Sequence, residues 1–143
     1  MWRLGWRFAF CGLTRNAAGK AFQTWKALLA ALLRMELEKL EALTKAEEQR
    51  KWLKTTAVPT TKMRPLSHLL EEAGHENISL WTDRALLLHE YQYHGPDPDM
   101  ALFRYTTRAE AADIIMTARE VMRRVETYKN RLWSNHLEKA LKE

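Results

Sequence analysis

Apolar residues recur at intervals of three and four along most of the chain, the spacing that places side chains on one face of an α-helix. The longest apolar stripe follows Thr14, which can cap the helix that carries it, and continues to residue 43. Its members are Ala18, Phe22, Trp25, Leu29, Leu32, Leu33, Leu37, Leu40 and Leu43. The mostly charged stretch of residues 35–50 predicts a break in this helix. Pro59 ends the pattern, because proline cannot continue a helix and disfavours helical geometry at the residue before it.

A short helix and then a more apolar helix are predicted after Pro59. The segment "RPLSHLLEEAG" has Pro65 in its first helical turn and Gly74 at its C-terminus, and each residue favours that position. Asn77 is a candidate cap for the next helix, which stops at Gly95. This helix is apolar on two sides, with Ile78, Trp81, Ala85 and Leu88 on one and Leu80, Leu87 and Tyr91 on the other. Such a helix usually lies at the centre of a bundle.

The last predicted helix begins with a capping box formed by Thr107 and Glu110. It continues with an unbroken apolar stripe of Ala111, Ile114, Ile115, Ala118, Val121, Met122, Val125, Tyr128 and Leu132. A further short helix near the start of the chain is indicated by Leu4, Phe8 and Cys11. No run with the two-residue period of a β-strand competes, so the sequence predicts an all-α, antiparallel bundle of four to five helices. We expect a single domain, residues 1–143, with a core bundle over 12–128 and a C-terminal helical extension over 129–143.

The composition of the chain is that of an ordinary soluble globular protein. Hydrophobic residues make up 46% of its 143 residues and charged residues 29%, which argues against disorder. The single Cys11 excludes an intramolecular disulfide, so we expect a cytoplasmic protein in a reducing compartment. No apolar run reaches the roughly 18 residues of a membrane span, and we expect no association with a membrane.

Positive charge is concentrated at the start of the chain. The residues before the first carboxylate, Glu36, carry a net charge of +6, and the rest of the chain carries −1. An acid-free, amphipathic start is typical of a solvated basic helix face, a nucleic-acid-binding face, a membrane-surface segment or a mitochondrial presequence. The sequence alone leaves these alternatives open.

Three blocks of sequence resemble the archaeal PaREP family. They are "RNAAGKAFQTWKALLAALL" at 15–33, "WLKTTAVPTTKM" at 52–63 and "LHEYQYHGPDPDMALFRYTTRAEAADI" at 88–114. The resemblance spans roughly residues 10–128, and the family is itself similar to HEPN domains, helical bundles linked to nucleotides and RNA. It implies an HEPN-like bundle from a thermophilic archaeon, which removes the presequence interpretation. It implies little about activity, because PaREP members are functionally uncharacterised. The N-terminal helix is shorter than the family's usual lead-in, and residues 129–143 run past its usual end.

Arg84 and His89 are the candidate catalytic residues. HEPN ribonucleases carry an arginine separated from a histidine by four to six residues, usually with a polar residue after the arginine, where this chain has Ala85. An imidazole can move the proton of a 2′-hydroxyl while a guanidinium offsets the charge at phosphate. Five residues of helix turn through roughly 140°, so the two side chains would point apart unless two protomers compose the site. The alternative is a surface arginine and a histidine packed between helices.

No metal site or cofactor is expected. His89, Glu90 and His94 form H-E-x-x-x-H, one residue longer than the H-E-x-x-H spacing that places both imidazoles on one helix face. His68 and His75 are interpreted as isolated surface histidines.

Candidate ligand-binding residues lie in two places along the chain. Aromatic side chains at the end of the central helix can stack on a base, and basic residues of the long helix can hold phosphate. These candidates are Tyr91, Tyr93, His94, Arg15, Lys20 and Lys26. The alternative for the tyrosines is that their rings pack against a neighbouring helix and leave the hydroxyls in water. The small Ala17, Ala18 and Gly19 predict a close approach of two helices.

Three functions follow from these patterns. The first is a non-catalytic HEPN-like module of toxin–antitoxin or nucleotidyltransferase type, which binds nucleotide, RNA or a protein partner such as a nucleotidyltransferase. The second is a metal-independent endoribonuclease that uses Arg84 and His89 at a dimer interface. The third is a structural homodimer without a ligand, and the six tryptophans favour a helix-mediated dimer. We expect the first.

Overall fold

The described part of the chain is built from helices and short turns. The computed structural model describes residues 14–44, 47–53, 58–94 and 112–142. Their elements are α2 (Thr14–Met35), α3 (Leu37–Leu43), α4 (Glu47–Leu53), the 3₁₀ helix η2 (Thr60–Lys62), α5 (Met63–Glu72), α6 (Ile78–His94) and α7 (Ala112–Lys142). The prediction of an all-α bundle is confirmed. The predicted helix before Thr14 and the capping box at Thr107 and Glu110 lie outside the described residues.

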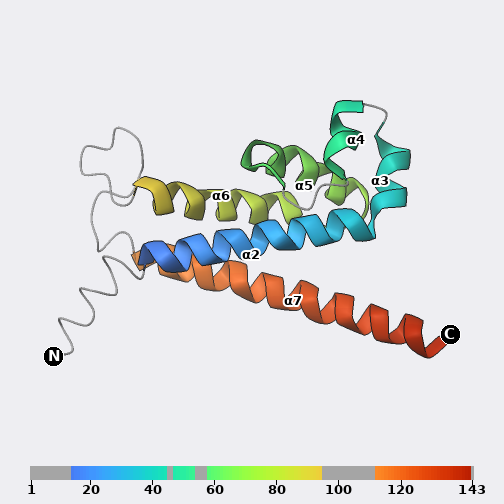
Figure 1. Ribbon diagram of the computed structural model, residues 1–143. Coiled ribbons are helices and arrows are strands. Elements are labelled where there is room, and N and C mark those ends of the chain that lie inside the picture. The colour runs from blue at the N-terminus through green and yellow to red at the C-terminus, as the bar shows by residue number, and fades with distance from the viewer. Residues whose placement is uncertain (1–13, 45–46, 54–57, 95–111, 143) are drawn as a thin grey trace.

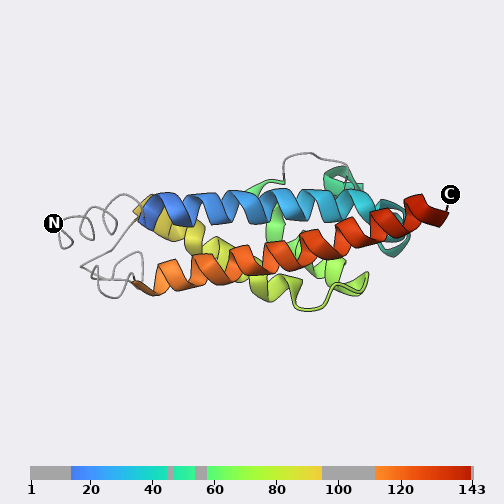
Figure 2. The same ribbon diagram turned by 90° about the horizontal axis from the view of Figure 1, so that it is seen from below.

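Three long helices, α2, α6 and α7, lie side by side, with α2 against both of the others (Figure 1). Helix α6 runs antiparallel to its two neighbours, whereas α2 and α7 run in the same direction (Figure 2). The bundle is therefore not antiparallel throughout. Helices α3–α5 bring the chain back to the end of the bundle where α2 finishes. Helix α6 therefore runs opposite to α2, and α7 then runs in the direction of α2. None of the described helices is long and apolar enough to cross a membrane.

The core is centred on the buried face of α2. Trp25 is fully buried, and its indole Nε1 donates a hydrogen bond of 3.0 Å to Oγ1 of Thr82 on α6. Thr82 in turn donates to the backbone oxygen of Ile78 at 2.8 Å, so the buried hydroxyl is used as both acceptor and donor. The ring of Tyr128 on α7 meets the indole edge-on, with ring centroids 6.3 Å apart. One side chain thus joins all three long helices.

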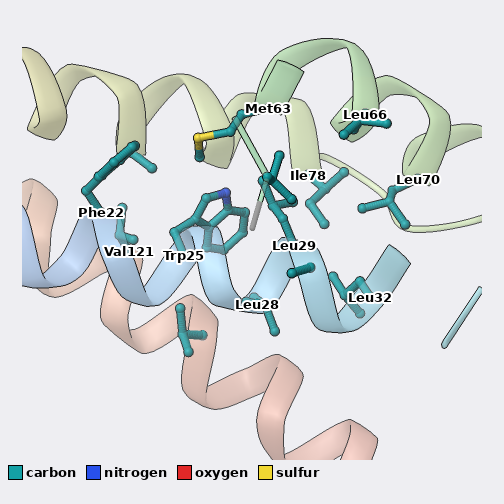
Figure 3. Packing of buried hydrophobic residues seen from close by; sticks show 14 of the residues in the cluster. Phe22, Trp25, Leu28, Leu29, Leu32, Met63, Leu66, Leu70, Ile78 and Val121 are labelled. Atoms are coloured by element: carbon teal, nitrogen blue, oxygen red, sulfur yellow. The ribbon is translucent and has the colours of Figure 1, made fainter. Parts of the chain in front are cut away.

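The short helices cover one side of this core. Figure 3 shows α2 side chains pointing towards α5 and the start of α6, while Leu28 points towards α7. Fully buried apolar side chains of this layer include Leu40, Leu53, Val58, Met63, Leu66 and Leu70, and they pack with Ile78 at the start of α6. The predicted break in the long helix is confirmed, because α2 ends at Met35 and α3 begins at Leu37. The mostly charged residues after Met35 therefore form two short helices and not a continuation of one rod.

The turn between α5 and α6 depends on Gly74. Its φ of 109° lies in the left-handed region, which favours glycine. The backbone N–H of His75 donates to Leu70 O and that of Gly74 to Glu71 O, both at 3.0 Å, which is the hydrogen-bond pattern of a Schellman motif. The predicted helix end at Gly74 is confirmed.

Asn77 directly precedes α6, at the position predicted for its cap, but the carboxylate at this helix start comes from Glu71. The backbone oxygen of Asn77 accepts a hydrogen bond from the backbone N–H of Trp81 at 3.3 Å, and the φ of Asn77 is 64°. The N–H of Ser79 donates to Glu71 Oε1 at 2.7 Å. Hydrogen bonds from Ser79 hold the pKa of Glu71 below its ordinary value. A negative charge at a helix start is stabilised by the helix dipole, so Glu71 ties the end of α5 to the start of α6.

His75 fastens this turn to the junction between α2 and α3. Its Nε2 lies 3.3 Å from Glu36 Oε1, and the imidazole is half-buried. Lys39 donates from Nζ to the backbone oxygen of Ala73 at 2.8 Å. The interpretation of His75 as a surface histidine is therefore wrong, whereas His68 is exposed.

Helices α2 and α6 approach each other closely at Gly19. A Cβ atom at this position would lie 2.5 Å from Nε2 of Gln92 and 2.6 Å from its Cδ. The predicted close approach is confirmed here. Its neighbours differ, because Ala18 is fully buried and Ala17 is exposed.

Substitutions at Gly19 test this close approach. We expect Gly19→Ala to be nearly neutral, because a gain of about 1 kcal/mol in helix propensity offsets displacement of the flexible end of Gln92. Gly19→Leu should lower the free energy of unfolding by roughly 1–3 kcal/mol through overpacking, and Gln92→Ala in the same chain should recover part of this loss. Chemical denaturation measures both effects. A Gly19→Leu variant as stable as the wild type would contradict the packing.

Candidate functional site

A groove of about 440 Å³ lies between α2 and α7. Its lining residues come from the first half of each helix and are Ala17, Lys20, Ala21, Ile115, Ala118, Arg119, Met122 and Arg123. The parallel packing of the two helices explains this register, because residues near both N-termini meet along one seam. The same register places Trp25 next to Tyr128 farther along.

The groove has an apolar floor because α2 contributes small side chains to it. Ala17 and Ala21 leave space between the helix backbones that a larger residue would fill. On the α7 side the groove is lined by Ile115, which is partly buried, and by Met122, which is 37% exposed. Met122 is thus one of the larger apolar side chains that the described chain presents to solvent.

The rim of the groove is positively charged. Lys20, Arg119 and Arg123 are all exposed, and the described lining holds no carboxylate. Because α2 and α7 run in parallel, the partial positive charges of both helix N-termini also lie at this end of the seam. An anion is therefore favoured here by the side chains, and beside Ala17 and Ile115 also by the helix N-termini.

Arg15 lies outside this groove and caps α6. Its Nε and Nη2 donate to the backbone oxygen of Gln92 at 2.9 and 2.7 Å, and Nη2 also donates to that of Tyr93 at 2.9 Å. The last carbonyls of a helix lack intrahelical donors and carry partial negative charge, so a guanidinium stabilises them. Arg15, which was predicted to bind phosphate, thus already donates hydrogen bonds to the backbone of α6.

Lys26 lies on the α6 side of α2, beside an aromatic cluster. Its Nζ is 5.8 Å from the centroid of the Phe22 ring, on which the His89 imidazole stacks at 4.2 Å between centroids. Tyr93 meets His89 edge-on at 4.8 Å and is 69% exposed. Tyr91 is 1% exposed and belongs to the core, so the alternative of a ring packed against its neighbours holds for it.

The predicted ligand-binding side chains that the structure describes are thus divided between two faces and the core. Lys20 lies in the α2–α7 groove, while Arg15, Lys26 and Tyr93 lie on the α2–α6 side. The side chain of His94 lies outside the described residues, although its backbone ends α6. The structure does not assemble them into one site.

Arg84 and His89 contact different helices. Arg84 forms an ion pair with Glu120 of α7, and its guanidinium lies 4.8 Å from the centroid of the Trp81 ring. His89 faces Phe22 of α2, and burial together with the charge of Lys26 lowers the pKa of its imidazole. The two side chains therefore have different neighbours on one protomer, and their catalytic role stays a prediction.

A family comparison adds the context of this fold. The model of the archaeal PaREP1/PaREP8 family matches residues 1–116. The chain belongs to this family. The match begins before the range of the sequence resemblance, roughly 10–128, and ends soon after α7 begins. A relationship of this PaREP1/PaREP8 member to HEPN domains stays a prediction. Neither the curated proteins nor the solved structures provide a match to the chain.

The sequence pattern had not singled out Arg119 and Arg123, which lie beyond the matched range of the family. Their spacing of four residues places them on one side of a helix, and this signal was present in the sequence. The sequence does not show that α2 is the helix that lies along that side, because this depends on how the helices pack. Metal ligands were not expected, and no group of three or more candidate metal-binding side chains occurs within the described residues.

Arg15→Gln tests the cap on α6. We expect the free energy of unfolding to fall by about 1 kcal/mol, because exposed charge-assisted hydrogen bonds to Gln92 and Tyr93 are lost. Lys20→Gln is the matched control and should change stability little, since Lys20 is exposed on the groove rim. Equal stability of Arg15→Gln and the wild type in urea denaturation would contradict the capping role.

His89→Phe tests the partly buried imidazole of His89. The fold disfavours protonated His89, so below its ordinary pKa of 6.5 the unfolded chain binds a proton that the folded chain excludes. Stability contributed by neutral His89 is therefore present above pH 6.5 and is lost as the pH falls towards the lower, folded-state pKa. His89→Phe keeps an aromatic ring against Phe22 and removes this dependence, so the variant should gain stability relative to the wild type on acidification. Thermal unfolding measures the difference in stability between the variant and the wild type across this pH range. A difference that stays constant as the pH falls would contradict the prediction.

Proposed function

We propose that this PaREP1/PaREP8 member is a non-catalytic module that binds nucleotide or RNA, and that the α2–α7 groove holds an anionic part of the ligand. The observation that supports it is the rim of Lys20, Arg119 and Arg123 around an apolar floor. No ion pair among the described residues neutralises these three side chains. Their positive charge is therefore available to a ligand.

The chemistry of the groove fits a phosphorylated, partly apolar compound. Arginine binds phosphate oxygens through a planar set of donors, and lysine adds a compact charge. The apolar surface of Ile115, Met122 and the two alanines can cover a sugar edge or base. A purely polar trough would lack this second feature.

The separation of Arg84 from His89 supports a non-catalytic role. Arg84 forms an ion pair with Glu120 of α7, whereas His89 lies against Phe22 of α2. A protein partner of nucleotidyltransferase type and a homodimer remain predictions of the sequence.

Neutralising the groove tests the proposal. Lys20→Gln, Arg119→Gln and Arg123→Gln should each weaken binding of a fluorescent RNA oligonucleotide about fivefold, or about 1 kcal/mol, and the triple variant about 100-fold. Arg34→Gln removes the same charge from an exposed site about 21 Å farther along α2 and should bind normally. Fluorescence anisotropy measures the binding. A wild-type protein that does not bind the RNA, or a triple variant that binds it as tightly as the wild type, would contradict the proposal.

The same RNA tests the catalytic alternative. We expect it to remain intact with the wild-type protein, with or without EDTA. Cleavage in EDTA that is lost in both Arg84→Ala and His89→Ala would instead establish the metal-independent ribonuclease.

A further inference from the structure

Positive charge on α7 extends beyond the groove to the opposite flank of the helix. Arg119 and Arg123 line the α2 side. On the α6 side, the guanidinium of Arg124 lies 5.6 Å from the centroid of the Trp81 ring and 5.4 Å from that of Tyr128. The guanidinium of Arg131 lies 5.7 Å from the same tyrosine ring. Two sets of arginines therefore flank the solvent-facing side of one helix.

This segment of α7 carries a clear excess of positive charge. Residues 119–131 hold five basic side chains and two carboxylates. One carboxylate, Glu120, is paired with Arg84 across the seam with α6, which leaves Glu126 as the other acid of the segment. Figure 2 shows that no other described helix lies over this side of α7. Four of the five basic side chains are exposed, namely Arg119, Arg123, Lys129 and Arg131, so most of the excess charge is open to solvent.

Arg124 is held in place without a carboxylate partner among the described residues. Its Nε atom is buried and has no hydrogen-bond acceptor in that part of the structure. Contacts with the two aromatic rings restrict the side chain and leave its positive charge uncompensated. A restricted, unpaired guanidinium is suited to bind an external phosphate, because less side-chain entropy is lost on binding.

The layout of these cations distinguishes two kinds of ligand. A site for a single nucleotide usually encloses most of its ligand, whereas Lys20, Arg119 and Arg123 are all exposed. The charge also continues from Arg119 to Arg131, about 18 Å along the helix, or about five nucleotides at the spacing of stacked bases. An open surface with charge that continues past the groove fits a polymer of phosphates.

We infer that an RNA strand crosses the exposed side of α7. Its phosphates would lie in the α2–α7 groove and at Arg124 and Arg131 on the α6 side of α7. The inference rests on the proposed function and extends its ligand from a nucleotide held in the groove to a strand that continues past it. Bases can lie against the guanidinium groups that cover Trp81 and Tyr128, as arginine planes in RNA-binding proteins do.

The test compares a single nucleotide with an oligonucleotide of about ten residues, using the full chain. Binding of AMP is measured by calorimetry, and binding of labelled RNA by anisotropy over a series of salt concentrations. Arg119→Gln with Arg123→Gln changes the groove, Arg131→Gln changes the seam, and Arg34→Gln is the control. Arg131 is exposed, so its replacement should leave the fold intact, and circular dichroism checks this. Arg124→Lys keeps the charge and serves as the conservative variant.

We expect the groove variant to weaken binding of both ligands. Arg131→Gln should weaken RNA binding about fivefold, lower the salt slope by about one, and leave AMP binding unchanged. RNA binding that is reduced by the groove variant but unaffected by Arg131→Gln would overturn the crossing strand and leave the proposed function standing. RNA binding that the groove variant does not reduce, or no binding of either ligand, would overturn both.

Discussion

The buried indole of Trp25 is the contact on which the arrangement of the long helices depends. It donates to Thr82 of α6 and meets the ring of Tyr128 of α7, so the rotation of α2 about its own axis is set relative to both neighbours. An indole N–H that is fully buried needs an acceptor, and Thr82 provides one in the core. With this rotation fixed, Gly19 faces α6 and Ala17 faces α7.

The two sides of α2 consequently use their basic residues differently. Arg15 stabilises the carbonyl end of α6, and Lys26 lies beside Phe22 and His89. Lys20 is left on the other side, where it joins arginines of α7. Charge near the start of the chain is therefore partly structural. Within the described residues, Lys20 shares its exposed surface with Arg119 and Arg123 of α7.

Much of the fold could be predicted from the sequence because its signals are local. Apolar spacing marks the helices, and Gly74 marks a helix end that its φ of 109° requires. The close approach at Gly19 followed from small residues, although the partner residue Gln92 did not. Pro59, predicted as a helix stop, lies between α4, which ends at Leu53, and the short 3₁₀ helix that begins at Thr60.

The candidate site was harder to predict because it depends on contacts between distant segments. The groove exists because α2 and α7 are parallel, and an opposite direction of α7 would have placed other residues beside Lys20. Net charge did not reveal that Arg15 is engaged by backbone oxygens of α6. Helical spacing did show that Arg84 and His89 diverge, as their separate neighbours Glu120 and Phe22 indicate.

The central claim is that one buried indole sets the positions of α6 and α7 around α2. Nuclear Overhauser spectroscopy on the full chain measures this most directly. The account predicts cross-peaks from the Trp25 ring to both the Tyr128 ring and the Thr82 side chain, with slow solvent exchange of the indole proton. Rapid exchange of that proton, or a Trp25 ring without cross-peaks to Tyr128, would contradict it.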